Sequence, residues 1–86
     1  MNTDSFKGQV AIVTGAGQGI GFEICRQLAF KGAAVLLNDI DENLTSSAVT
    51  KIKKEAGNCI GLSGDASDID FINEMVKQAM NNFGKL

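Results

Sequence analysis

The segment that decides the fold is V-A-I-V-T-G-A-G-Q-G-I-G, residues 10–21. Its first four residues are apolar and mostly β-branched, which is typical of a short, fully buried strand. A helix is expected to follow and to end at Gly32. Its inward side chains would be Ile20, Ile24, Cys25, Leu28 and Ala29. Four glycines in the eight residues 14–21 therefore fill a tight turn between a strand and a helix.

The rest of the chain repeats this alternation. Strands are expected over residues 34–37 and 59–62, and Gly61 weakens the second of them. The helix between them should be capped by Asp41 and should end at Gly57-Asn58. Its inward side chains would be Leu44, Ala48, Val49, Ile52 and Ala56. Ser67 is expected to cap a last helix that Gly84 ends. The inward side chains of that helix would be Ile69, Ile72, Val76, Ala79, Met80 and Phe83.

The order β-α-β-α-β-α predicts an α/β fold in which helices cover a parallel sheet. Right-handed crossovers place the first two helices on one face and give the strand order 3-2-1. The last helix should cross to the other face and feed a fourth strand, which these residues do not contain. We therefore expect the first half of a doubly wound sheet. The 10–13 strand would lie at its edge, where pairing with another chain would lead to self-association.

The glycine-rich turn predicts a site for a pyrophosphate. Gly15 allows a sharp turn, Gly19 allows a ligand to touch the main chain, and Gly21 allows the helix to pack closely against the strand. The first turn of the helix also offers unpaired N–H groups and the positive end of the helix dipole. The alternative interpretation is that any tight turn between a strand and a helix uses glycine.

Acidic residues follow the next two expected strands. Asp39 could accept hydrogen bonds from adenosine ribose hydroxyls, and its charge, with no Lys or Arg in the glycine turn, favours NAD over NADP. The alternative is that Asp39 only organises a loop with Asp41. Asp65, followed by Ala66, could accept a hydrogen bond from the adenine amine, although Gly64-Asp65 is also ordinary turn chemistry. All three signals fall at carboxyl ends of strands, where open parallel sheets bind ligands.

Composition excludes several other functions. The chain has no His and two Cys, so we expect no zinc site of the usual kind and no Ser-His-Asp or Cys-His catalytic group. A net charge of −2 argues against a nucleic-acid partner. No apolar run approaches the ~20 residues of a membrane span, and the polar N-terminus lacks a signal-peptide core. A cytoplasmic protein is expected, with Cys25 and Cys59 reduced and buried.

These motifs resemble those of the short-chain dehydrogenase/reductases over essentially the whole chain. Residues 7–14 look like the family's opening strand, and residues 14–21 fit its cofactor loop T-G-x-x-x-G-I-G at every fixed position. Residues 83–86 resemble the segment that leads into its fourth strand. The resemblance implies a Rossmann fold and a dinucleotide cofactor, NAD rather than NADP. The implied cofactor-binding residues are Gly15, Gln18, Gly19, Ile20, Gly21, Asp39, Ile40, Asp65 and Ala66.

The same resemblance places Ile20 near the nicotinamide, Ile40 beside the adenine, and Thr14 as a tie between the loop and a neighbouring strand. The family's N-N-A-G segment, catalytic Ser and Tyr-x-x-x-Lys pair do not occur in these residues, and the chain has no Tyr at all. No catalytic residue is therefore assigned. We expect residues 1–86 to be a truncated dinucleotide-binding domain of an oxidoreductase that acts on an alcohol or carbonyl, with a small-molecule substrate only in a full-length form. The alternative is a non-catalytic nucleotide-binding module, or an inert piece completed by another chain.

Overall fold

The computed structural model describes residues 5–55 and 57–84 of the chain. Six elements alternate along it: β1 (Val10–Val13), α1 (Gly19–Phe30), β2 (Ala34–Asp39), α2 (Glu42–Lys54), β3 (Asn58–Ser63) and α3 (Ile69–Phe83). The strands form a parallel sheet in the order β1-β2-β3, in register from Val10 opposite Ala34 and from Ala34 opposite Asn58. The predicted α/β class and strand order are confirmed. Strands β2 and β3 are longer than expected, so Asn38 and Asp39 belong to β2 itself.

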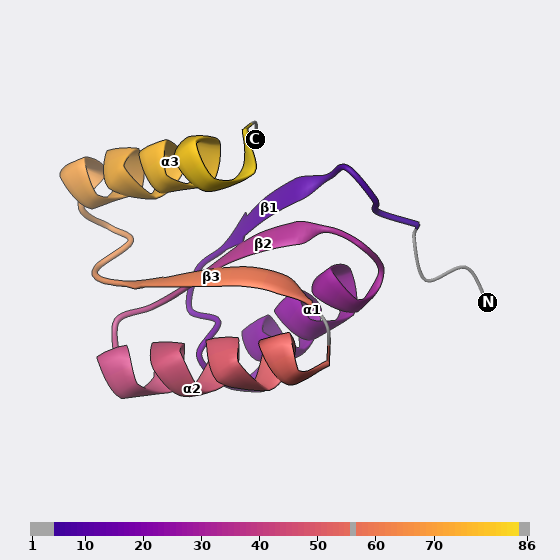
Figure 1. Cartoon of the computed structure of the whole chain (residues 1–86). Helices are drawn as coiled ribbons and strands as arrows, with labels where there is room; N and C mark the ends of the chain where they lie inside the picture. Colours follow the sequence, from indigo (N-terminus) through magenta and orange to yellow (C-terminus); the bar gives the residue numbers. More distant parts are fainter. Residues whose placement is uncertain (1–4, 56, 85–86) are drawn as a thin grey trace.

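Helices α1 and α2 cover one face of the sheet and α3 covers the other (Figure 1). The central strand β2 shows the alternation that this arrangement requires. Val35 and Leu37 pack among the side chains of α1 and α2, whereas Leu36 packs with Met75 and Ala79 of α3. All three β2 side chains are fully buried. The predicted crossing of the last helix to the opposite face is therefore confirmed.

Two predicted helix faces are partly wrong. In α1, Cys25 and Ala29 are buried, but Ile20 is 83% exposed and Ile24 is also exposed. Helix α1 meets the sheet through its small side chains, which leaves the two isoleucines on its flank. In α3 the buried side chains are Met75 and Ala79. The other members of its expected stripe are half-buried Phe83 and four exposed residues, Ile69, Ile72, Val76 and Met80. The apolar face of α3 is wider than the strip of sheet it contacts.

Helix α2 agrees better with the prediction. Ala48 and Ile52 are buried and Leu44 and Val49 are half-buried, while Ala56 lies outside the described residues. Thr45, which was not expected in the core, is buried because its hydroxyl donates to the carbonyl oxygen of Asp41 at 2.9 Å. Gly61 of β3 lies beside this helix, and a Cβ there would sit 2.8 Å from Thr45 Cγ2. The glycine that weakens the strand signal thus allows α2 to lie close to β3.

The helix ends follow the predicted signals with two exceptions. Helix α2 was expected to end at Gly57-Asn58, but it ends at Lys54 with Glu55 as its C-cap, and Asn58 begins β3. Asp41 caps α2 by accepting from the Leu44 N–H at 3.0 Å. Gly32 and Gly84 both adopt a positive φ after α1 and α3. Ser67 does not cap α3. Asp68 takes that position and accepts from the Asp70 N–H at 2.9 Å, while the Ser67 hydroxyl is used in a hydrogen bond to Asp65.

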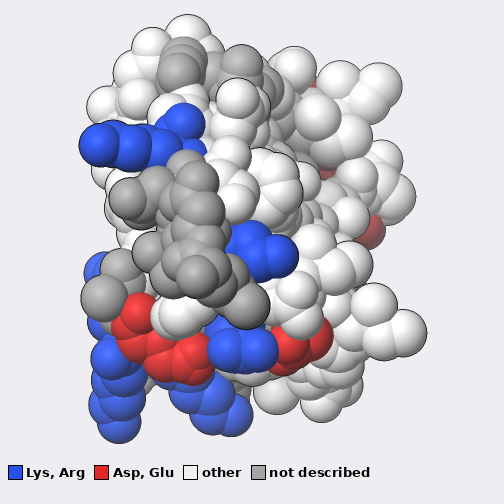
Figure 2. Space-filling model, turned by 90° about the vertical axis from the view of Figure 1, so that its right-hand side faces the viewer, with Lys and Arg blue, Asp and Glu red and all other residues white. Residues whose placement is uncertain are grey.

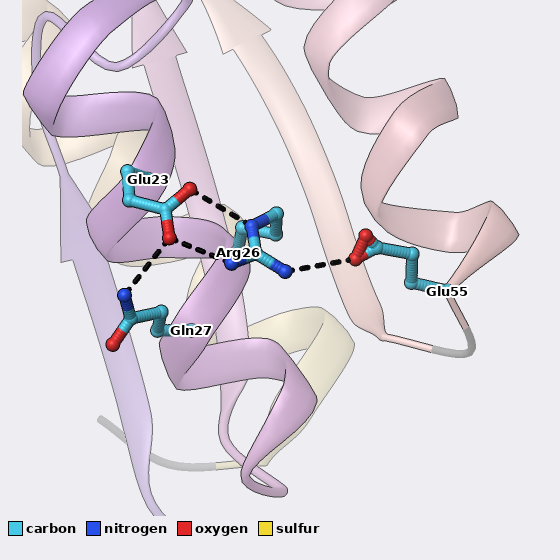
Figure 3. A network of polar contacts seen from close by, with 4 residues as sticks. All are labelled: Glu23, Arg26, Gln27 and Glu55. Atoms are coloured by element: carbon cyan, nitrogen blue, oxygen red, sulfur yellow. Dashed lines mark hydrogen bonds and ion pairs between the residues drawn. The ribbon is translucent and has the colours of Figure 1, made fainter.

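A surface ion-pair network joins α1 to the end of α2 (Figure 3). Arg26 donates to Glu23 at 2.6 Å and to Glu55 at 3.1 Å, and Gln27 donates to Glu23 at 2.8 Å. Hydrogen bonds from Arg26 and Gln27 lower the pKa of Glu23 to about 2. These groups are partly exposed to water, so we assign the network a minor role in stability.

The two thiols are free and fully buried in the core between the sheet, α1 and α2. Burial raises the pKa of Cys25 from 9.0 to about 12 and that of Cys59 from 9.0 to about 11. We therefore expect a thiol reagent at pH 8 to label the folded protein at least about 100-fold more slowly than the chain in urea, because the thiolate is the reacting form. Mass spectrometry of timed samples measures this rate. Labelling at the unfolded rate would contradict the burial of both thiols.

Candidate dinucleotide site

The loop between β1 and α1 turns sharply at two glycines. Gly15 has φ +62° and Gly19 has φ +67°, and neither has an atom within 4 Å of where a Cβ would be. The loop is tied to the sheet because the Ala16 N–H donates to the carbonyl oxygen of Asn38 at 2.7 Å. A Cβ on Gly21 would lie 2.8 Å from the Gly15 carbonyl oxygen. The close packing expected of Gly21 is therefore real, but its neighbour is the loop rather than the strand.

The first turn of α1 differs from those of the other two helices. Its cap residue, Gln18, is extended and makes no side-chain hydrogen bond to the helix, and the first turn contains no acid. By contrast, α2 is capped by Asp41 with Glu42 in its first turn, and α3 is capped by Asp68 with Asp70. The N–H groups and the positive dipole end of α1 are thus left without a negative partner from a capping side chain. Such a terminus suits a phosphate.

Asp39 ends β2 and its carboxylate lies against the glycine loop. Its Oδ2 accepts from the Gly17 N–H at 2.9 Å, and its Oδ1 accepts from the Asp41 N–H at 3.0 Å. These backbone donors, first Asp41 and then Gly17, lower the pKa of Asp39 below 3.8. The group is therefore ionised at neutral pH and fixed in direction. It organises the loop, as the simpler interpretation held, and because each carboxylate oxygen has two lone pairs, the group can still accept from a ligand hydroxyl.

Asp65 follows β3 in a turn of its own. Its Oδ1 accepts from both the main-chain N–H and the hydroxyl of Ser67, at 2.9 and 2.7 Å. The Ser67 side chain and then its N–H lower the pKa of Asp65 below 3.8. No described residue donates to the other carboxylate oxygen, Oδ2. Asp65 is exposed, and Ala66 beside it is half-buried.

A cleft of about 320 Å³ brings the three signals together at the carboxyl ends of the strands. This volume is at the lower end of ordinary ligand pockets. The residues that line it are Thr14, Gly15, Asn38, Asp39, Ile40, Gly64, Asp65 and Ala66. Four predicted residues do not line this cleft: Gln18, Gly19, Ile20 and Gly21. They lie at the start of α1, and Ile20 lines a separate apolar cavity of about 370 Å³ with Phe6 and Ile24.

Two residues of the site escaped the sequence analysis. Gly17 occupies a variable position of the loop motif, yet a Cβ there would lie 2.8 Å from Leu44 Cβ and 2.9 Å from Asp39 Cγ. Asn38 was not singled out from the sequence, yet it is 1% exposed and lines the cleft. Both roles depend on contacts between β2, the glycine loop and neighbouring elements, which no local pattern shows.

Basic side chains are concentrated at one end of the sheet and are absent from the described cleft at the other. The carboxyl ends carry Asp39, Asp41, Glu42, Asp65, Asp68 and Asp70. Figure 2 shows the opposite end, where Lys and Arg side chains gather together with some Asp and Glu side chains; Glu55, which follows the last turn of α2, is one acid at this end. The last turn of α2 alone supplies Lys51, Lys53 and Lys54 there. No described Lys or Arg belongs to the cleft or to the first turns of the helices beside it.

The described part of the chain lacks two other kinds of feature. Within residues 5–55 and 57–84, no helix has the length and apolar character needed to cross a bilayer. The same residues contain no group of three or more His, Cys, Asp or Glu side chains placed to hold a metal ion.

Comparison with known proteins identifies the class to which this fold and loop belong. The family model described as short chain dehydrogenase matches residues 9–86, so the chain belongs to the short-chain dehydrogenase family. Elsinochrome reductase 1 of Elsinoe fawcettii is 36% identical over 87 residues, which cover 100% of this chain and 33% of that protein. The (+)-neomenthol dehydrogenase of Arabidopsis thaliana is 42% identical over 80 residues, which cover 88% of this chain and 27% of that protein.

Solved structures agree with the family. A hydroxysteroid dehydrogenase from Escherichia coli superposes with a TM-score of 0.92 at 29% identity, covering 99% of this chain and 35% of that one. A citronellol catabolism dehydrogenase of Pseudomonas aeruginosa gives a TM-score of 0.87 at 27% identity, covering 94% of this chain and 34% of that one. The chain spans about a third or less of the length of the curated relatives it matches.

Proposed function

We propose that this chain forms the NAD-binding part of an oxidoreductase that acts on an alcohol or carbonyl group. The observation that carries the proposal is the cleft that joins Gly15, Asp39 and Asp65 at one edge of the sheet. Membership of the short-chain dehydrogenase family supports a nicotinamide dinucleotide as the ligand. When bound, that cofactor would supply the nicotinamide ring that exchanges hydride with a substrate.

The residues present fit a dinucleotide in chemical type. The uncapped start of α1, at Gln18, Gly19, Ile20 and Gly21, offers N–H donors to the pyrophosphate. Asp39 offers acceptors to the ribose hydroxyls, and Asp65 offers one to the adenine amine. Ile40 and Ala66 provide apolar surface in the cleft lining.

The preference for NAD over NADP rests on charge. A 2′-phosphate would lie near the ionised Asp39 carboxylate, and no described Lys or Arg lines the cleft to offset the repulsion. The neighbouring acids Asp41 and Glu42 add to that repulsion.

Titration of the 15N-labelled protein with NAD, followed by amide NMR, tests the proposal. We expect the largest shift changes at residues 15–21, 39–40 and 64–66, with a dissociation constant in the high micromolar to millimolar range, as is reasonable for a cleft open on one side. Adenosine alone should change the amide shifts only at residues 39–40 and 64–66. Shifts confined to the apolar cavity at Phe6 and Ile24, or none at millimolar NAD, would overturn the assignment of the site.

A further inference from the structure

One buried polar side chain holds the walls of the cleft together. Asn38 lies near the carboxyl end of the central strand β2 and is 1% exposed, although an amide in the core is costly unless its hydrogen bonds are made. Its side chain makes those bonds across the sheet. Its Nδ2 donates to the carbonyl oxygen of Leu62 at 3.0 Å and to that of Gly64 at 3.1 Å.

The main chain of the same residue holds the opposite wall. The Asn38 carbonyl oxygen accepts from Ala16 in the glycine loop at 2.7 Å. Next to it, the Asp39 carbonyl oxygen accepts from the Gly64 N–H at 3.0 Å. Asn38 therefore bonds on one side to the loop that leads to α1 and on the other to the turn that carries Asp65.

Few side chains could replace this one. The two hydrogens on Nδ2 serve the carbonyl oxygens of Leu62 and Gly64, with the Asp39 carbonyl oxygen at a longer 3.5 Å, and both come from a single atom on a short side chain. Leu would offer no donor, and Ser would offer one. Asp would turn a carboxylate oxygen toward two carbonyl oxygens, which is repulsive in a buried site.

We propose that Asn38 is a positioning residue that sets the separation of Asp39 and Asp65 and so fits the cleft to the adenosine half of the cofactor. This inference rests on the proposed function. Asn38 would act through the two walls, by fixing the ends of β2 and β3 relative to each other, and does not itself need to touch the ligand.

Asn38→Asp and Asn38→Ser test this role. Asn38→Asp should raise the NAD dissociation constant at least tenfold and should speed hydrogen exchange of the Gly64 and Ala16 amides at least tenfold relative to the amides of β1. Asn38→Ser keeps one donor, so its effects should be intermediate, and it serves if Asn38→Asp does not fold. The affinity for AMP should fall as much as that for NAD, because the substitution alters the part of the cleft that would hold the adenosine half of the cofactor.

Ile52→Val is the matched control. Ile52 is 1% exposed in the core under α2 and does not line the cleft, so this variant loses stability without touching the site. It should change the affinities for NAD and AMP by less than about twofold, and it should speed hydrogen exchange equally for the amides of the cleft and of β1. If Ile52→Val and Asn38→Ser had the same melting temperature and lost NAD affinity equally, the positioning role would be overturned. Unchanged hydrogen exchange of the Gly64 and Ala16 amides in both Asn38 variants would overturn it as well. If the unmodified protein fails to bind NAD, the proposed function fails, and the exchange data still decide whether Asn38 joins the two walls.

Discussion

Gly17→Ala should abolish measurable NAD binding and lower the free energy of unfolding by about 1–3 kcal/mol, the usual cost of overpacking. A Cβ at this position would lie 2.8 Å from Leu44 Cβ and 2.9 Å from both Asp39 Cγ and Oδ2. The Asp39 carboxylate cannot move away without losing its hydrogen bond from the Gly17 N–H. One added methyl group would therefore displace the loop, the carboxylate and the start of α2 together. Thermal unfolding and NAD titration measure the two effects.

Gly84→Ala separates lost binding from lost stability. Gly84 has φ +79° at the end of α3, and nothing lies within 4 Å of its Cβ position. The substitution should cost about 1–2 kcal/mol through backbone strain alone. We expect NAD affinity to survive in this variant. If Gly17→Ala bound NAD as well as Gly84→Ala does, the contact between the loop and Asp39 would have no part in the site.

Asp39→Asn should weaken NAD binding by roughly 10- to 100-fold, the equivalent of about one hydrogen bond to a charged group. Both Asp39 oxygens accept from main-chain N–H groups, and an amide has only one oxygen, so the variant must turn an NH₂ group toward one of those donors. Loss of the charge should also narrow the difference in affinity between NAD and NADP. Calorimetric titration with each cofactor measures both results.

Glu42→Gln is the control for this change in charge. Glu42 is exposed in the first turn of α2 and lies outside the cleft lining, so we expect it to alter NAD affinity by less than about twofold. A change of the same sign and size in both variants would mean that Asp39 contributes only its charge and no hydrogen bond to the ligand.

The low pKa of Asp39 also fixes how pH should act. Because this pKa is below 3.8 in the folded protein, its hydrogen bonds contribute to stability above pH 3.8 and are lost as the pH falls through the folded value. NAD binding should consequently be insensitive to this group at neutral pH.

Sequence patterns predicted the path of the chain better than the orientation of its helices. Local periodicity predicted the alternation of strands and helices. The handedness of the crossovers then led to the correct strand order. The exposure of Ile20 and Val76 was missed, because an apolar stripe does not say how much of its width a narrow sheet will cover. Ser67 and Asp68 are both good caps, and only the fold decides that Ser67 serves Asp65 instead. Asn38 and Gly17 depend on neighbours more than 20 residues away in sequence, beyond the reach of any local motif.

The distribution of charge along the sheet affects how fast a dinucleotide can reach the cleft. Acids lie along the edge where a diphosphate would arrive, and lysines gather at the far end, so an anionic ligand in solution meets repulsion before it comes within reach of the α1 amides. Attraction at this edge acts over a few ångströms, whereas the repulsion extends over the Debye length of about 10 Å at 0.1 M salt. Added electrolyte screens the longer-ranged effect first and should quicken capture of a dinucleotide, the reverse of what a basic cleft would do.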